Sequence, residues 1–184
     1  MRLLQAGART TVTLESAEPA TEEERGERHL LLVLAIFIVG YGADQLTKFW
    51  AVQNLDPANP PSFLGGLLKL KLVFNPGAAF GLGAGSTVFL SLFAIAALCV
   101  VLFVALPRVR GLWYSLIVAF LLVGISGNLT DRLFREPGPL RGHVVDFLAL
   151  PNFPVFNVAD MFVTGAAILL VITTFRHEAV DNGV

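Results

Sequence analysis

The sequence predicts an all-α integral membrane protein with four transmembrane helices and a small extracytoplasmic β-sheet in its first outward loop. Of its 184 residues, 55% are hydrophobic and 15% are charged, whereas soluble domains are about 45–50% apolar and about 25% charged. Of the 27 charged residues, 10 lie in the short segment Met1–Arg28, so the rest of the chain is poorer in charge than the average suggests. Long apolar runs then alternate with polar connections, as in a multi-pass membrane protein.

Four apolar segments are long enough to cross a bilayer, which takes about 20 residues of helix. Backbone groups in lipid must be satisfied within each segment, so we expect helices. A transmembrane barrel would instead show shorter segments of alternating hydrophobicity. The charged residues inside the segments are Asp44 and Lys48, near the end of the first, and Asp160, in the fourth. The segments are Leu30–Val52, Val88–Leu106, Leu112–Leu129 and Val155–Phe175.

Basic residues in short connections predict the orientation of the segments. Arg108 and Arg110 lie in the link between the second and third segments, and arginines also flank the free ends of the first and fourth. We therefore expect both termini and this link in the cytoplasm, with loops Gln53–Thr87 and Thr130–Pro154 outside. Three arginines in the second outer loop oppose this orientation unless structure or substrate engages them. They are Arg132, Arg135 and Arg141.

The chain is expected to divide into three parts. Residues 1–28 are polar and lack the apolar core of a cleavable signal peptide, so we expect a disordered cytoplasmic tail. Residues 29–176 contain the four segments and form the membrane domain. Residues 177–184 form a short cytoplasmic tail.

A strand is predicted in the first outward loop. Within Leu68–Leu72, leucine alternates with Lys69 and Lys71, and a period of two is typical of a half-buried strand. The apolar face of this strand could rest on the membrane surface, with the lysines toward headgroups or water. This pattern is the basis for the expected sheet.

Polar side chains within or beside membrane segments are costly and indicate functional sites by default. In the predicted topology they gather at the outer end of the helices. Asp44 and Lys48 are four residues apart and can pair on one helix face; an interfacial anchor with Lys48 reaching out to water is the alternative. For Asp131 and Arg132, an ion pair or helix cap that fixes the loop is a better interpretation than direct catalysis. The side chains that gather are Asp44, Lys48, Asn128, Asp131, Arg132, Asp146, Asn157 and Asp160.

Asp146 and Asp160 have no Lys or Arg three or four residues away on either side. At a rise of 1.5 Å per residue, Asp160 would lie about 7–8 Å below Val155, just inside the membrane boundary. Two such acids in a partly dry setting raise each other's proton affinity. One can then stay ionised and activate water while the other donates a proton to a substrate carbonyl. Acids near a helix start also serve as caps.

Other functions fit the residues less well. A small membrane transporter or proton relay would place acids near the middle of the bilayer, often beside broken helices. A Mg²⁺-dependent lipid phosphatase would need paired carboxylates and several phosphate-binding basic residues, and a purely structural four-span scaffold does not explain the buried acids. We expect no metal and no cofactor, and the formal net charge of −1 gives no reason to expect nucleic acid.

Five short segments, in this order and in register with the four apolar segments, resemble the bacterial lipoprotein signal peptidase (signal peptidase II) family. Each segment alone is a weak signal, and together they are highly specific. They extend over most of the chain from Leu30 to Phe175. The segments are Asp44–Lys48, Asn75–Gly81, Gly127–Arg132, Val144–Phe147 and Phe156–Asp160.

The resemblance implies an aspartyl endopeptidase of the bacterial cytoplasmic membrane, with its active site near the outer face. Such enzymes cut prolipoproteins just before a diacylglyceryl-modified cysteine. Residues 29–176 would then be the peptidase domain, in contact with membrane lipid, and we expect a monomer. By motif position the catalytic pair is Asp146 and Asp160. The supporting or substrate-binding residues are Asp44, Lys48, Asn75, Gly77, Asn128, Asp131, Arg132 and Asn157.

Two features depart from the compact pattern of this family. Residues 1–28 form an added polar segment without a matching motif. Phe134–Gly142, rich in Arg, Pro and Gly, makes a long connection between Asp131 and Asp146. Both lie outside the five matching segments. The second affects the shape of the rim of the predicted site and leaves the identity of the two acids unchanged.

Overall fold

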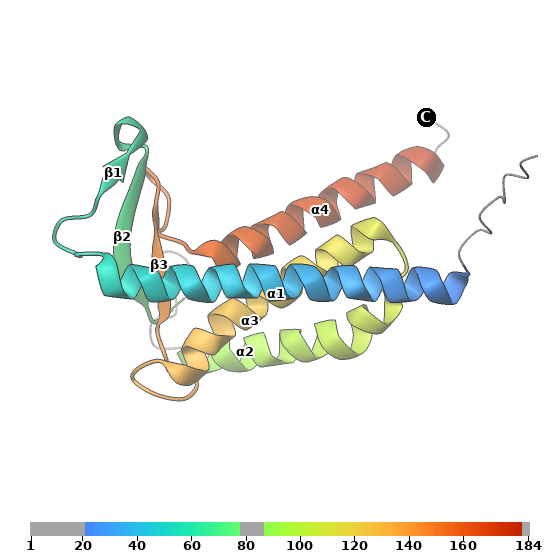
Figure 1. Cartoon of the computed structure of the whole chain (residues 1–184), viewed down its shortest axis with the longest axis horizontal. Helices are drawn as coiled ribbons and strands as arrows, with labels where there is room; N and C mark the ends of the chain where they lie inside the picture. Colours follow the sequence, from blue (N-terminus) through green and yellow to red (C-terminus); the bar gives the residue numbers. More distant parts are fainter. Residues whose placement is uncertain (1–20, 78–86, 182–184) are drawn as a thin grey trace, which may run out of the picture.

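The computed structural model of the chain describes residues 21–77 and 87–181. Its helices are α1 (Glu22–Asn54), α2 (Thr87–Val100), α3 (Leu112–Phe134) and α4 (Val158–Asp181). These four helices lie side by side, and a small sheet covers one end of the bundle (Figure 1). We call this the sheet end; α1 and α3 stop there, and α2 and α4 begin there. The start of α1 and the end of α4 are both at the opposite end of the bundle (Figure 1).

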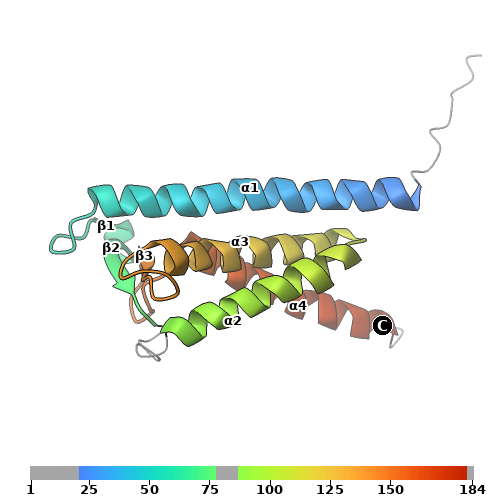
Figure 2. The same ribbon diagram turned by 90° about the horizontal axis from the view of Figure 1, so that it is seen from below.

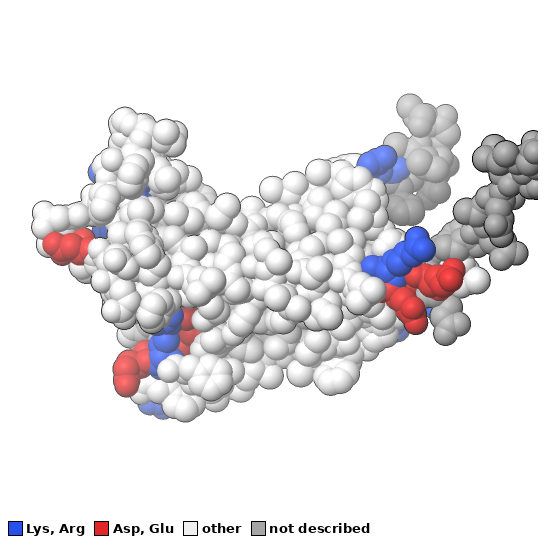
Figure 3. Space-filling view, in the orientation of Figure 1, with Lys and Arg blue, Asp and Glu red and all other residues white. Residues whose placement is uncertain are grey.

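Each of these four helices is long and apolar enough to cross a membrane. Helix α2 continues through a π-helical stretch, Val101–Ala105, and a 3₁₀ turn, Leu106–Arg108. With this extension the apolar stretch Thr87–Arg108 is long enough to cross a membrane. Figure 3 shows the charged side chains on the visible face at the two ends of the bundle, with a band free of them between. The predicted fold class is confirmed: the chain is a multi-pass membrane protein with four helices in its described part.

Helix α3 is the centre of the bundle. It packs against α1, α2 and α4, and it lies between the other helices in Figure 2. Its Val118, Ala119 and Leu122 form a buried core with Val33 of α1 and Val101. The outward faces of the other three helices carry large exposed apolar side chains, as expected for helices that face lipid.

The sheet at the sheet end has three antiparallel strands in the order β1 (Ser62–Phe63), β2 (Leu68–Asn75) and β3 (Val144–Ala149). The prediction of a sheet in the first loop is confirmed for β1 and β2. The third strand was missed because it comes from the other loop and is a nearly continuous buried run. Such a run lacks the alternation that identifies a half-buried strand. The sheet therefore joins the two loops at this end.

The alternation in β2 is confirmed, with Lys69 and Lys71 exposed and Leu72 buried. The buried face packs differently from the expectation that it could rest on the membrane surface. Leu72 lies in a core with Val145 of β3 and with Ala51 and Leu55 from the end of α1. The sheet is thus fixed to the helical bundle by its own apolar core.

The first helix begins earlier than predicted. Thr21 is its N-cap: the Thr21 hydroxyl accepts a hydrogen bond from the Glu24 N–H, and the Glu24 carboxylate accepts one from the Thr21 N–H, which is a capping box. Residues 22–28 were expected in a disordered tail, and this part of the prediction is wrong because they begin α1. The rest of that predicted tail, residues 1–20, lies outside the described residues. At the other terminus residues 177–181 belong to α4.

Helices α3 and α4 also differ from their predicted bounds at the sheet end. Helix α3 continues beyond Leu129, so Asp131 and Arg132 lie on its last turns and not in a loop. Helix α4 begins after its predicted start because Asn157 caps it, with the Asn157 Oδ1 accepting the Asp160 N–H at 3.0 Å. Both differences fix polar side chains on helical backbone.

Two glycines of α3 let neighbouring elements approach closely. A Cβ at Gly124 would lie 2.8 Å from the carbonyl oxygen of Ala159 in α4 and would also press against the Val163 side chain. A Cβ at Gly127 would lie 2.5 Å from the Asp44 Oδ2 atom. Small residues at such positions allow membrane helices to pack backbone against backbone.

We predict that Gly124→Ala lowers the midpoint of thermal unfolding in detergent, because overpacking costs about 1–3 kcal/mol. The matched control is Gly42→Ala, since nothing lies within 4 Å of the Cβ that this α1 glycine would acquire. The control is expected to leave the midpoint unchanged or raise it, because alanine is favoured over glycine in a helix. A Gly124→Ala protein as stable as the control would contradict the close approach of α3 and α4.

Candidate active site

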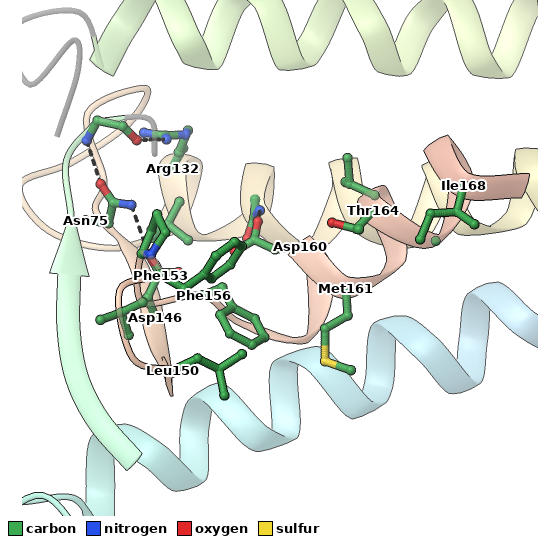
Figure 4. Close-up of a pocket in the computed structure, with 17 residues that line it drawn as sticks. Asn75, Arg132, Asp146, Leu150, Phe153, Phe156, Asp160, Met161, Thr164 and Ile168 are labelled. Atoms are coloured by element: carbon green, nitrogen blue, oxygen red, sulfur yellow. Dashed lines mark hydrogen bonds between the residues drawn. The ribbon is translucent and has the colours of Figure 1, made fainter. Parts of the chain in front are cut away.

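A cavity of about 690 Å³ opens at the sheet end, and both Asp146 and Asp160 line it. Figure 4 shows polar side chains at one end of this cavity and apolar side chains along the first turns of α4. The polar lining residues at that end are Asn75, Asn128, Arg132, Asp146 and Asp160, and the apolar lining includes Leu150, Phe153, Phe156, Met161 and Ile168. The cavity therefore joins a compact polar site to an apolar groove.

Strand β3 positions Asp146. Successive side chains of a strand point to opposite faces, so Val145 and Phe147 pack in the core beside α1 while Asp146 faces the cavity. The Asp146 side chain is buried. Its Oδ2 accepts a hydrogen bond from Asn75 Nδ2 at 2.9 Å, and its Oδ1 accepts one from Asn157 Nδ2 at 2.6 Å. Two amide donors thus hold this carboxylate in place.

The first turn of α4 positions Asp160. Its Oδ2 accepts the backbone N–H of Asn157 at 3.2 Å, and its own N–H donates to the Asn157 side chain in the cap bond described above. Its Oδ1 accepts a hydrogen bond from Asn128 Nδ2 of α3 at 2.8 Å. Asp160 therefore caps the helix with one oxygen and also faces the cavity. The capping interpretation is confirmed, and the part of Asp160 in an acid pair stays a prediction.

Asn157 links the two carboxylates. Its fully buried side chain donates from Nδ2 to Asp146 and to the Asn128 Oδ1 at 3.0 Å, while its Oδ1 accepts from the Asp160 backbone. Among the described residues, every buried side-chain nitrogen or oxygen has a hydrogen-bond partner. The predicted convergence of Asp146 and Asp160 from separate parts of the chain is thus found in the structure.

Burial raises the pKa of the Asp146 carboxyl to about 6. Hydrogen bonds from Asn75 and Asn157 and the charge of Lys48 lower this pKa, whereas the charge of Asp160 raises it further. A carboxyl with such a pKa exchanges between protonated and ionised forms near neutral pH. A raised pKa beside a second acid in a cavity is typical of acid–base sites.

Asp44 and Lys48 form the predicted ion pair, with the Lys48 Nζ atom 2.9 Å from the Asp44 Oδ2 atom. The alternative of an interfacial anchor is wrong, because the Lys48 side chain is fully buried and does not reach water. Lys48 Nζ also lies 2.8 Å from the Asp131 Oδ2 atom on α3. The pair therefore connects α1 to α3 in the protein interior.

The ion pair or cap expected to fix the loop at Asp131 and Arg132 takes another form, because these two side chains bind other partners and not each other. Adjacent residues on a helix point in different directions, so Asp131 faces Lys48 and Arg135. Arg132 instead donates from Nη2 to the carbonyl oxygen of Gly77 at 2.8 Å and fixes the chain after β2. Two of the three arginines that opposed the predicted orientation are thus engaged in structure. The last four residues of the matching segment Asn75–Gly81 lie outside the described residues.

The sequence analysis missed some residues of the site. Arg135 pairs with Asp131, and its i,i+4 spacing was a signal that could have identified it. Met161, Thr164 and Ile168 line the apolar groove, and Asp160, Thr164 and Ile168 repeat at the spacing of one helix face. Within the described residues, no three His, Cys, Asp or Glu side chains are grouped so that they could hold a metal ion.

Residues 36–176 match the family model described as signal peptidase (SPase) II. The chain belongs to the signal peptidase II family. A lipoprotein signal peptidase of Leifsonia xyli subsp. xyli is 40% identical over 175 residues, which cover 95% of this chain and 80% of the relative. A lipoprotein signal peptidase of Mycobacterium tuberculosis (strain H37Rv) is 44% identical over 168 residues, covering 85% of this chain and 83% of the relative.

Solved structures share the fold. A bacterial membrane enzyme solved by the in meso method at 2.3 Å resolution superposes with a TM-score of 0.69 and 24% identity, covering 86% of this chain and 92% of that one. Membership of the signal peptidase II family makes the chain a signal peptidase, a hydrolase of peptide bonds. The alternative of a small transporter or proton relay is not favoured.

We predict that Asp131→Asn destabilises the folded protein, because removal of one partner from a buried ion pair costs about 3–5 kcal/mol. Asp131 is 1% exposed and pairs with both Lys48 and Arg135. The control is Asp56→Asn, a change at an exposed acid in the loop after α1. Thermal unfolding in detergent should show a clear loss for the first variant and little change for the second; equal midpoints would contradict the structural role of Asp131.

Proposed function

We propose that this member of the signal peptidase II family removes signal peptides from prolipoproteins by aspartic catalysis, with Asp146 and Asp160 as the catalytic pair. The cut would lie just before a diacylglyceryl-modified cysteine. The observation that carries the proposal is that two carboxylates from separate elements line one cavity and both accept hydrogen bonds from Asn157, Asp146 from its side-chain amide and Asp160 from its backbone N–H. The relatives that match most of this chain are named lipoprotein signal peptidases.

The pair would act with one shared proton. The ionised carboxylate takes a proton from a water molecule, whose oxygen attacks the carbonyl carbon of the scissile amide. The protonated carboxyl donates its proton to the carbonyl oxygen, and the roles reverse when the amine leaves with a proton. Such a coupled pair titrates as a unit, and the raised pKa of Asp146 is consistent with a proton shared near neutral pH.

The surrounding residues support this chemistry in three ways. Asn75, Asn128 and Asn157 orient the two carboxylates. Arg132 and Gly77 shape the entrance, where a small residue lets an extended peptide approach closely. Asp44, Lys48 and Asp131 are structural support. No cofactor or metal is needed for the proposed steps.

The apolar groove along α4 suits a substrate that remains attached to the bilayer. Its lining residues Met161 and Ile168 are exposed on the side of α4, so an acyl chain can enter from the lipid. The lipid would then act as the recognition handle while the amide reaches the two acids. Water would come from the sheet end of the bundle.

We further propose that the chain lies in the cytoplasmic (inner) membrane of a bacterium as a monomer, with both termini in the cytoplasm and the active site near the outer face. The support is the position of Arg108 and Arg110 in the link between α2 and α3, at the end opposite the sheet, because basic links stay in the cytoplasm. Residues 29–176 would form the peptidase domain, and the polar ends would lie on the cytoplasmic side.

Asp146→Asn and Asp160→Asn should each slow cleavage of a diacylglyceryl-modified prolipoprotein by at least about 100-fold, because loss of an acid–base group costs this much. The measurement is mass analysis of the products formed by purified protein. Glu136→Gln, which changes an exposed acid outside the cavity, is the control and should cleave normally. Normal cleavage by either aspartate variant would remove that residue from the catalytic pair.

The pH dependence of cleavage should report the pKa of Asp146. Cleavage requires one proton on the pair, so the rate should fall as the pH rises through the pKa of Asp146, about 6. The Asn75 amide donates to the ionised form of Asp146 and so lowers this pKa. Asn75→Ala removes that donor, which raises the pKa and should move the alkaline limb up by about one pH unit.

The matched control for the pH experiment is Asn59→Ala. Asn59 also donates to an aspartate, Asp56, but both side chains are exposed and lie outside the cavity. This variant should have the pH profile of the unmodified protein. An alkaline limb that stays in place in Asn75→Ala, or moves down, would contradict the assignment of this limb to Asp146.

A further inference from the structure

The ammonium group of Lys48 contacts an unusual set of acceptors. Besides the Asp44 and Asp131 carboxylates, at 2.9 Å and 2.8 Å, it donates to the Asn128 Oδ1 atom at 3.0 Å and to the carbonyl oxygen of Gly127 at 3.3 Å. The Lys48 side chain has no exposure to solvent. One buried cation of α1 therefore holds two acids and one amide of the surrounding structure.

Each carboxylate held by Lys48 also binds the backbone beside one acid of the proposed pair. The Asp44 Oδ1 atom accepts the N–H of Ala159 at 2.8 Å, and Ala159 directly precedes Asp160. The Asp131 Oδ2 atom accepts the N–H of Val145 at 3.2 Å, and Val145 directly precedes Asp146. The start of α4 and strand β3 are thus both tied to acids that meet at the same ammonium.

The amide held by Lys48 contacts Asp160 directly. An ammonium can only donate hydrogen bonds, so the contact with Lys48 requires that the Asn128 oxygen points toward it. The Asn128 nitrogen must then point the other way, where it donates to the Asp160 Oδ1 atom. Lys48 therefore sets which end of the Asn128 amide faces the carboxylate, together with Asn157 Nδ2, which donates to the same oxygen at 3.0 Å.

We propose that Lys48 is a positioning residue that fixes the separation and orientation of Asp146 and Asp160, acting through Asp44, Asp131 and Asn128. This inference rests on the proposed function, since it assigns the two acids to catalysis. Without the ammonium, the Asp44 and Asp131 carboxylates would repel each other, because one oxygen of each lies within hydrogen-bond distance of the same Lys48 Nζ atom. The backbone segments that they hold would move apart, and the Asn128 oxygen would lose one of its two side-chain donors and keep the Asn157 Nδ2 atom.

The test must separate positioning from stability, because Lys48→Met alone leaves two buried carboxylates without their shared cation. The double variant Asp44→Asn/Lys48→Met removes both charges of the α1 pair. The amide introduced by Asp44→Asn keeps an oxygen for the Ala159 N–H, and Asp131 keeps its ion pair with Arg135. The double variant should therefore fold while lacking the ammonium that joins α1 to Asp131 and Asn128.

The measurement is the kcat and KM for cleavage of a diacylglyceryl-modified prolipoprotein, together with the thermal unfolding midpoint. We expect kcat of the double variant to fall about 100-fold, as for a small misplacement of catalytic groups, with KM little changed, because the groove that binds substrate is intact. Loss of kcat and kcat/KM in equal measure indicates an interaction needed only in the transition state.

The control is Tyr41→Phe, which removes the 3.0 Å hydrogen bond between Tyr41 of α1 and Thr130 of α3. It weakens contact between the same two helices away from the cavity and should leave kcat unchanged. A folded double variant with the kcat of the unmodified protein would overturn only the positioning role of Lys48 and not the proposed function. Failure of the unmodified protein to cleave, in contrast, would overturn the proposed function itself.

Discussion

A bilayer offers no water to a charged side chain, so charged groups inside the membrane must find their partners within the protein. At the sheet end this constraint is met by one buried ammonium, Lys48, which is shared by Asp44 and Asp131. Neither carboxylate has water to replace the contact, since both are at most 1% exposed. Their remaining oxygens and N–H partners then determine where the start of α4 and strand β3 lie. The geometry of the cavity therefore follows from a requirement of charge burial.

The membrane helices could be predicted from the sequence, because a bilayer imposes a minimum length and an apolar composition on any crossing segment. Their ends could not be placed as well. Hydropathy does not register caps, and α1 begins with a capping box at Thr21 while α4 begins at the Asn157 cap. Strand β3 was missed for a related reason. Its side chains are buried on both faces, so the contrast between faces that identifies β2 is lost.

For the site, spacing along one helix predicted the pair of Asp44 and Lys48, because residues four apart share a face. Contacts between elements far apart in the sequence have no such rule. The partners of Asp131 include groups of α1 and β3, and its sequence neighbour Arg132 is turned away toward Gly77. The residue types at the site could thus be predicted, whereas their pairing depends on how α3 packs between the other helices.

The position of the acids reconciles two needs of the proposed chemistry that oppose each other. A carboxyl that holds a proton near neutral pH must be removed from water, and burial raises the pKa of Asp146 accordingly. Hydrolysis nevertheless consumes a water molecule, and a pair at the middle of the bilayer would have no supply of it. Asp160 in the first turn of α4 and Asp146 in the sheet lie where the apolar bundle ends. Amide donors from Asn75, Asn128 and Asn157 keep the two carboxylates ordered there. Burial by the protein can therefore raise the pKa of Asp146 at a position that water reaches from the end of the bundle.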